Sequence, residues 1–141
     1  MKNNNTKFLL ILGSSRKNGE DILKKAILEL ARYFYIVRQT DIIKTKAFGV
    51  DYTDYFFNQA IIIESQLSIH WIMKKLQKIE KSLGQKRKTQ FWGERVIDID
   101  IIFASDITYY DTNINLPHES IYSRDYVVDL IKKIGWENEK F

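Results

Sequence analysis

The hydrophobic positions divide the chain into short apolar runs and longer amphipathic stripes. Residues 8–12 (Phe-Leu-Leu-Ile-Leu) form a continuous apolar run, which predicts a buried strand. In residues 20–34 apolar side chains recur at three- and four-residue steps, which predicts an amphipathic helix. Residues 35–43 and 56–63 are rich in β-branched and aromatic side chains, so each is predicted to form a strand.

The second half of the chain continues with two helices and one strand. Ser68 is a good N-cap for a helix that ends at Gly84. Residues 96–103 alternate in polarity and predict a fourth strand, and Ser123 is expected to cap a third helix that Gly135 follows. This order predicts an α+β, ferredoxin-like sandwich with a βαββαβ core, an extra hairpin and a C-terminal helix.

Composition narrows the class of protein. A chain of 141 residues, 45% hydrophobic and 28% charged, fits one globular domain spanning residues 1–141. The net charge of +4 is too small to indicate nucleic acid by itself, but it is compatible with a polyanionic ligand. The absence of cysteine excludes disulfides, thiol catalysis and cysteine-ligated metals. The apolar run near the start is too short for a signal peptide or a membrane span, so a cytoplasmic location is expected.

Two aspartates in the fourth predicted strand are the most informative chemical feature. Because side chains alternate along a strand, Asp98 and Asp100 point to one face and the intervening isoleucines to the other. Such positions are about 6.7 Å apart, where two carboxylates repel by about 2 kcal/mol at an effective dielectric near 20. A divalent cation removes this repulsion, and oxygen ligands without cysteine or histidine indicate Mg²⁺. By itself, the pattern also fits two ordinary aspartates on a solvent-facing strand.

Basic residues cluster immediately before these aspartates. Lys86, Arg87 and Lys88 precede the strand, and Arg95 lies at its start. Cations beside a metal-binding carboxylate pair suit a triphosphate, because Arg binds phosphate oxygens in a bidentate manner and Lys adds a point charge. The chain contains no Walker loop or dinucleotide fingerprint. Side chains and metal, rather than a glycine-rich loop, would therefore hold a nucleotide.

Other charged residues carry less information. The lysines of the second helix are interpreted as a solvated face; they are Lys74, Lys75, Lys78 and Lys81. Glu80 falls on the apolar side of that helix, so its carboxylate either reaches solvent or has a partner. A single histidine such as His118 indicates little on its own.

Taken together, these residues form an extended motif. It reads Arg87-x-x-x-x-Trp92-Gly93-x-Arg95-x-x-Asp98-x-Asp100, then Leu116-Pro117-His118, then Arg124-x-Tyr126. The motif resembles that of the 6-hydroxymethyl-7,8-dihydropterin pyrophosphokinases of folate biosynthesis, and the resemblance extends from the first strand to about residue 134. It implies transfer of the pyrophosphoryl group of ATP to 6-hydroxymethyl-7,8-dihydropterin, giving the pterin diphosphate and AMP.

The resemblance also implies a set of site residues. Asp98 and Asp100 would bind two Mg²⁺ ions together with ATP, and Arg95 would join them as a catalytic residue that stabilises the transition state. The implied ATP-binding residues are Gln77, Arg87, Lys88, Trp92, Arg95, Ile101, His118 and Arg124. The implied pterin-binding residues are Thr45, Phe48, Phe56, Asn58, Trp92 and Tyr126. Phe57 is interpreted as core, and residues 84–91 as a lid over ATP. The resemblance further implies a monomer with no nucleic-acid or membrane partner.

Some positions depart from the family pattern, and two alternatives follow. The departures are Ser15, Lys46, Gln85, Phe91 and Leu130. The loss of loop cations at 85 and 91 motivates a weakened homologue that binds ATP or pterin without efficient catalysis. A ferredoxin-like RNA-binding module is a different class, but the chain lacks the aromatic sequence that such modules carry. Because the motif's aspartates, Arg95, Asn58 and His118 are present, activity is expected.

Overall fold

The computed structural model describes residues 5–46, 55–85, 96–105, 109–110, 115–116, 118 and 124–136. In chain order the elements are β1 (Thr6–Ser14), α1 (Gly19–Tyr33), β2 (Tyr35–Gln39), β3 (Ile43–Lys46), β4 (Tyr55–Ser65), α2 (Ile69–Ser82), β5 (Asp98–Ala104), β6 (Tyr109–Tyr110), β7 (Asn115–Leu116) and α4 (Asp125–Ile134).

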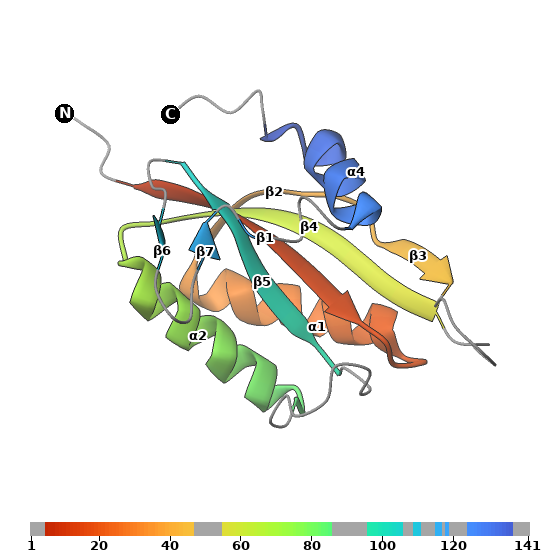
Figure 1. Cartoon of the computed structure of the whole chain (residues 1–141). Coiled ribbons are helices and arrows are strands. Elements are labelled where there is room, and N and C mark those ends of the chain that lie inside the picture. Colours follow the sequence, from red (N-terminus) through yellow and green to blue (C-terminus); the bar gives the residue numbers. More distant parts are fainter. Residues whose placement is uncertain are drawn as a thin grey trace.

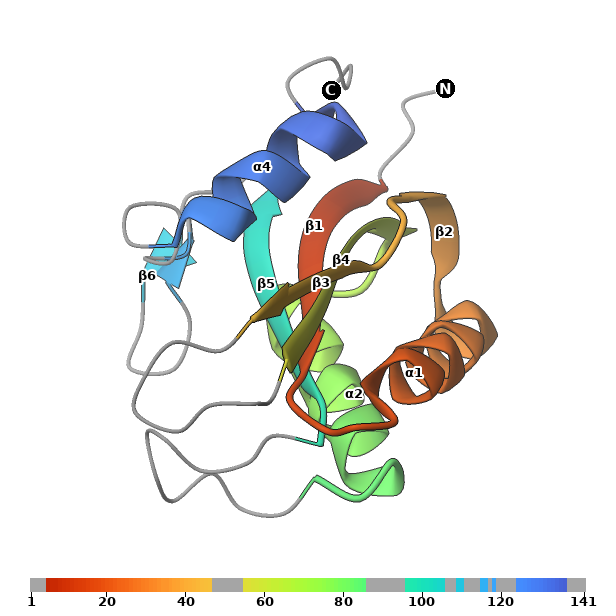
Figure 2. The same cartoon turned by 90° about the vertical axis from the view of Figure 1, so that its right-hand side faces the viewer.

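A five-stranded antiparallel sheet forms the middle layer. Its order is β2-β4-β1-β5, and β3 pairs with the part of β4 that β2 leaves open. Helices α1 and α2 lie on one face of the sheet and α4 lies on the other (Figure 1). Figure 2, turned by 90°, shows the same three layers with β3 and the beginning of β4 toward the viewer. The predicted ferredoxin-like βαββαβ core is confirmed, as are the β6–β7 hairpin and the C-terminal helix.

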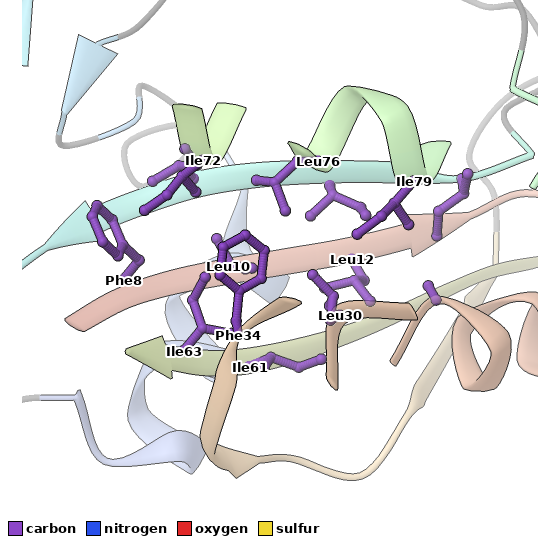
Figure 3. Packing of buried hydrophobic residues seen from close by; sticks show 14 of the residues in the cluster. Phe8, Leu10, Leu12, Leu30, Phe34, Ile61, Ile63, Ile72, Leu76 and Ile79 are labelled. Atoms are coloured by element: carbon purple, nitrogen blue, oxygen red, sulfur yellow. The ribbon is translucent and has the colours of Figure 1, made fainter. Parts of the chain in front are cut away.

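The central strand β1 is apolar on both sides because each face of the sheet is covered by helix. Phe8, Leu10 and Leu12 belong to the core beneath α1 and α2, while Leu9 and Ile11 belong to the core beneath α4. Figure 3 shows the first core, in which side chains of α1, α2, β1 and β4 meet. The continuous apolar run of the sequence therefore reflects burial on both faces.

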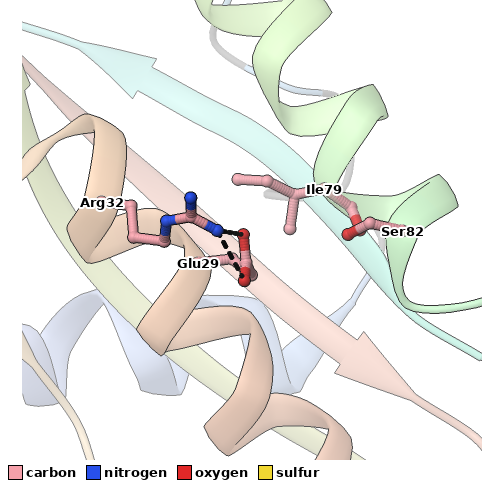
Figure 4. A network of polar contacts seen from close by, with 4 residues as sticks. All are labelled: Glu29, Arg32, Ile79 and Ser82. Carbon is pink, nitrogen blue, oxygen red and sulfur yellow. Dashed lines mark hydrogen bonds and ion pairs between the residues drawn. The ribbon is translucent and has the colours of Figure 1, made fainter.

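The two helices of the lower layer bury one stripe each. On α1, Leu30 is fully buried while its near neighbour Leu28 is 69% exposed. Half-buried Glu29 and exposed Arg32 form an ion pair of 3.3 Å on this helix (Figure 4). Such surface pairs contribute little to stability, so burial of the apolar stripe holds the helix in place.

Residues 35–43, predicted as one strand, form two. The break is centred on Thr40, whose N–H donates to the Ala60 carbonyl at 3.0 Å. The Thr40 hydroxyl in turn accepts a hydrogen bond from the Ala60 N–H at 3.1 Å. Because a side chain replaces a backbone group in the ladder here, β2 ends at Gln39 and β3 begins at Ile43.

The start of α2 and the end of α4 are those predicted from the sequence, but the start of α4 is not. Ser68 occupies the N-cap of α2, and Gly135 ends α4 in the left-handed conformation, with φ of 72°. The prediction that Ser123 caps the last helix is wrong, because Arg124 occupies the N-cap position. Its extended backbone precedes the first helical residue, Asp125.

Candidate functional site

The α4 face of the sheet carries a row of three residues on three adjacent strands. Gly13 of β1 pairs with Asn58 of β4 on one side and with Asp98 of β5 on the other. Paired residues of an antiparallel sheet point to the same face, so Asn58 and Asp98 face each other across a residue with no side chain. A Cβ at position 13 would lie 2.8 Å from Asn58 Oδ1. The absence of a side chain at position 13 therefore lets the Asn58 amide oxygen lie close over β1.

The second aspartate lies on the same face, one row further along β5. Asp100 pairs with Ile11, whose side chain is in the core beneath α4. Ile97 and Ile99 are buried in the opposite core, against α1 and α2. This alternation is the predicted one, and it places Asp98 and Asp100, both half-buried, on the α4 face. The Oδ1 atom of Asp98 is shielded from solvent.

The polar and aromatic residues of β3 and β4 extend this face away from the carboxylates. Thr45 pairs with Phe56, two residues before Asn58 on β4. Phe56 is 42% exposed and Asn58 is buried. Phe57 points to the other face, where it packs against the core of α1 and α2, in agreement with its interpretation as a core residue. Thr45, Phe56 and Asn58 thus share one face with the carboxylates.

Arg124 and Tyr126 join the site from the start of α4. The Arg124 Nη1 donates a hydrogen bond to the Tyr126 hydroxyl at 3.2 Å. Partial burial opposes the charge of Arg124, but Tyr126 and the carboxylates of Asp100 and Asp98 outweigh it and raise the guanidinium pKa. The structure therefore brings an arginine into the electrostatic field of the carboxylate pair.

His118 is hydrogen-bonded to the outer edge of β5, the strand that carries Asp98 and Asp100. Its backbone N–H donates to the Ile102 carbonyl of β5 at 2.9 Å, and the residue is half-buried. This bond holds His118 two residues beyond Asp100 along β5. The structure therefore places the backbone of His118 beside the strand that carries Asp98 and Asp100.

Two predicted ATP-binding side chains are not brought to this face. Ile101 is buried in the core beneath α1 and α2, because it alternates with the aspartates. Gln77 is exposed on α2, which covers the opposite face of the sheet. The remaining predicted site residues lie outside the described residues; they are Phe48, Arg87, Lys88, Trp92 and Arg95. The predicted lid, residues 84–91, is described only at Gly84 and Gln85.

Glu80 and Gln85 have a structural role that the sequence left open or missed. Glu80 is 6% exposed, and its Oε2 accepts a hydrogen bond from the Ile99 N–H at 3.0 Å. Gln85 Oε1 accepts hydrogen bonds from the N–H groups of Val96, at 2.9 Å, and Ile97, at 3.2 Å. The signal for Glu80 was a carboxylate on the apolar side of a helix, which requires a partner when buried.

The spacing role of Gly13 was also missed. The sequence signal was a glycine at the end of a buried strand, which often marks close approach of another group. Here that group is the side chain of Asn58.

The donor chemistry of the site fits Mg²⁺. Asp98 and Asp100 supply hard carboxylate oxygens, and Mg²⁺ usually binds one or two carboxylates while keeping waters and substrate phosphates as its other ligands. Within the described ranges there is no group of three or more His, Cys, Asp or Glu residues that would form a complete protein cage. Two carboxylates without a third protein ligand among the described residues therefore suit a metal that arrives with a phosphate ligand. None of the described helices has the length and apolar character needed to cross a membrane.

Comparisons with known proteins identify the family of this chain. The model of the family described as 7,8-dihydro-6-hydroxymethylpterin-pyrophosphokinase matches residues 9–135. A 2-amino-4-hydroxy-6-hydroxymethyldihydropteridine pyrophosphokinase of Methylorubrum extorquens is 30% identical over 92% of this chain and 83% of its own length. One of the same name from Aquifex aeolicus is 29% identical over 83% of this chain and 72% of its own length.

The fold is also found among solved structures. An HPPK-DHPS of Plasmodium falciparum superposes with a TM-score of 0.71 and 14% identity, covering 94% of this chain and 40% of that one. This likeness supports the ferredoxin-like fold of the described residues. The family match over residues 9–135 shows that the chain belongs to the 7,8-dihydro-6-hydroxymethylpterin-pyrophosphokinase family.

Proposed function

We propose that the α4 face of the sheet, where β4, β1 and β5 adjoin, is the site at which this chain performs the reaction of its family. That reaction transfers the pyrophosphoryl group of ATP to 6-hydroxymethyl-7,8-dihydropterin in folate biosynthesis. The observation that carries the proposal is the row Asn58–Gly13–Asp98. The Asn58 amide suits a pterin edge, the Asp98 carboxylate suits a metal-bound phosphate, and the glycine between them lets the Asn58 oxygen lie close over β1.

The dimensions of this row support the assignment. Neighbouring strands are about 4.8 Å apart, so the backbones at 58 and 98 are separated by roughly 10 Å. That distance accommodates a flat ring beside one strand and a phosphate beside the other. A reaction between two bound substrates requires alignment within about 3–3.5 Å of the reacting atoms, which one shared rigid surface provides.

On the nucleotide side, Asp98 and Asp100 would hold Mg²⁺, two ions according to the resemblance. When bound, Mg²⁺ supplies neutralisation of phosphate charge. Arg124 keeps its positive charge beside the carboxylates, and its guanidinium offers paired donors to phosphate oxygens. His118 and Arg95 complete the proposed nucleotide contacts, together with Arg87 and Lys88.

On the pterin side, Phe56 and Tyr126 would contact the two faces of the ring. The exposure of Phe56 supports this role, because a large aromatic side chain open to solvent suits stacking with a flat heteroaromatic ring. Asn58 and Thr45 would donate to and accept from the polar ring edge. Phe48 and Trp92 are proposed to close the same pocket.

The chemical step needs little beyond this alignment. The oxygen of the pterin hydroxymethyl group attacks the β-phosphorus of ATP, and the bond from that phosphorus to the oxygen bridging it to the α-phosphorus breaks. AMP leaves with the electron pair, and the hydroxyl proton passes to solvent. Arg95 is proposed to stabilise the charge that develops in the transition state. We further propose that residues 1–141 act as one domain, as a monomer, in the cytoplasm.

The test is formation of AMP from ATP in the presence of 6-hydroxymethyl-7,8-dihydropterin and Mg²⁺, with an Asp98→Ala control. Pterin-dependent AMP that disappears in the control supports the proposed site. A folded protein that binds ATP or pterin but forms no AMP contradicts it and supports a binding homologue instead. In that case Phe91, one of the departures from the family pattern, becomes the first position to replace with arginine.

A further inference from the structure

We propose that Glu80 and Gln85, at the end of α2, are positioning residues that fix the metal-binding segment of β5 from its outer edge. The two residues are called the α2 clasp below. This inference rests on the proposed function, because it concerns how Asp98 and Asp100 are held for metal and phosphate.

The clasp acts at the side of β5 that β1 does not cover. β5 is the edge strand of the five-stranded sheet, so its outward N–H groups need partners from elsewhere. Glu80 Oε2 accepts from Ile99 N–H at 3.0 Å. Ile99 lies between Asp98 and Asp100 in sequence. A bond at this residue therefore fixes the backbone from which both carboxylates project.

Gln85 secures the residues just before the aspartates. Its Oε1 atom accepts from both Val96 N–H, at 2.9 Å, and Ile97 N–H, at 3.2 Å. These residues precede the first strand residue, Asp98, and no other strand of the described chain pairs with them. One side-chain oxygen thus orders the backbone that leads into the site.

The end of α2 is built to present these two side chains. The Gln85 N–H donates to the Glu80 carbonyl at 3.0 Å, and the Gly84 N–H donates to the Lys81 carbonyl at 3.1 Å. This pair of bonds is a Schellman motif, and it requires a left-handed residue, which Gly84 supplies with φ of 102°. Glu80 therefore accepts hydrogen bonds through both its backbone and its side chain. Its backbone carbonyl accepts one from Gln85 at the end of α2, and its carboxylate accepts one from Ile99 of β5.

The position of the clasp explains why it should act on metal binding rather than on the substrates directly. Glu80 is buried with the core of α1 and α2, on the face opposite the carboxylate pair. Its effect reaches the site through the Ile99 backbone. A displacement of that backbone moves both carboxylates together, and catalytic geometry tolerates little displacement.

The experiment compares four variants with the wild type. Glu80→Leu and Gln85→Leu remove the acceptor oxygens, and Glu80→Gln keeps one at the same place. Lys78→Leu is the matched control, since Lys78 is exposed on the same helix. The main measurement is the Mg²⁺ concentration for half-maximal pterin-dependent AMP formation. Binding of a non-hydrolysable ATP analogue with and without Mg²⁺, by calorimetry, gives a second readout that needs no turnover.

A positioning role predicts a tenfold or greater rise in the Mg²⁺ midpoint for Glu80→Leu and at least a threefold rise for Gln85→Leu. Glu80→Gln and Lys78→Leu should stay within twofold of the wild type. The same order is expected for loss of the Mg²⁺-dependent part of analogue binding. If Glu80→Leu does not fold, judged by circular dichroism, Gln85→Leu decides. Folded leucine variants with wild-type Mg²⁺ midpoints overturn the inference.

Failure of the α2 clasp inference can be distinguished from failure of the proposed function. A wild-type protein that forms no AMP, or an Asp98→Asn variant with full activity, refutes the proposed function. The clasp is then judged by amide hydrogen exchange at Ile99, with Leu10 in the central strand as reference. Exchange at Ile99 that is at least tenfold faster in Glu80→Leu than in Glu80→Gln supports the clasp, and equal rates overturn it.

Discussion

Gly13 and Asn58 approach so closely that one added carbon at position 13 would meet the Asn58 amide oxygen at 2.8 Å. The two residues pair across β1 and β4, and the atom that would clash is at the end of the Asn58 side chain. A distance of that length between a Cβ atom and an oxygen would be shorter than an ordinary van der Waals separation. Activity and stability should therefore respond differently to a substitution at this glycine.

Gly13→Ala is expected to raise the KM for the pterin by about 10- to 100-fold, because Asn58 must move from its position. The free energy of unfolding should change by less than about 1 kcal/mol, since alanine suits a strand better than glycine does. Steady-state kinetics and urea unfolding measure the two effects. Unchanged pterin KM in the folded variant would show that the Asn58 position does not matter for binding.

Asp98→Asn is expected to lower kcat/KM by about 10²–10³-fold, corresponding to a loss of about 3–4 kcal/mol of transition-state stabilisation. The substitution keeps the shape of the side chain but removes its charge. Chelation of Mg²⁺ by EDTA should abolish wild-type activity, and added Mg²⁺ should restore it. A variant that retains more than a tenth of wild-type activity would argue against a metal ligand at this position.

Arg124→Lys is expected to weaken ATP binding by about tenfold, because lysine keeps the charge but loses the two-pronged geometry. The control is Tyr126→Phe, which removes the acceptor of the Arg124 hydrogen bond while keeping the ring. It should cost only about 0.5 kcal/mol in ATP affinity, roughly a twofold loss. Calorimetry with the ATP analogue measures both. Equal losses of ATP affinity in Arg124→Lys and Tyr126→Phe would mean that Arg124 acts through its hydrogen bond to Tyr126 rather than through contact with phosphate.

The raised pKa of Arg124 also fixes an expectation for pH. A group with a folded pKa above its unfolded value stabilises the protein below the unfolded pKa and loses this effect as pH rises through the folded pKa. For an arginine that window lies in strongly alkaline solution. Between pH 6 and 9, therefore, neither stability nor ATP affinity should show a titration from this residue. An Arg124→Lys variant with the same pH profile as wild type is the expected result.

Phe56 and Phe57 are neighbours in β4 but point to opposite faces, so their alanine variants should differ in kind. Phe56→Ala is expected to raise the pterin KM by about tenfold, with a small change in stability, because its ring is 42% exposed. Phe57→Ala is expected to cost about 2–4 kcal/mol of stability, because its ring packs against the core of α1 and α2. Urea unfolding and pterin kinetics on both variants check this. Reversed effects would mean that the two faces are wrongly assigned.

Local signals in the sequence were sufficient for most of the fold. The continuous apolar run of β1, the stripes of α1 and α2, and the alternation around Asp98 each depend on neighbours in the chain. The split of residues 35–43 was not predictable in this way. It depends on the Thr40 hydroxyl bonding to Ala60, twenty residues later, and such a contact leaves no local pattern.

The sequence by itself determined the βαββαβ order, the shared face of Asp98 and Asp100, and the family motif, because strand alternation and residue spacing are properties of the chain. Only the tertiary structure decided that Gly13 separates Asn58 from Asp98 and that Glu80 faces β5 rather than solvent. The physical reason is the same for both. Strand register and the packing of a helix against a strand edge join residues that are distant in sequence, and their positions follow from burial of the whole core.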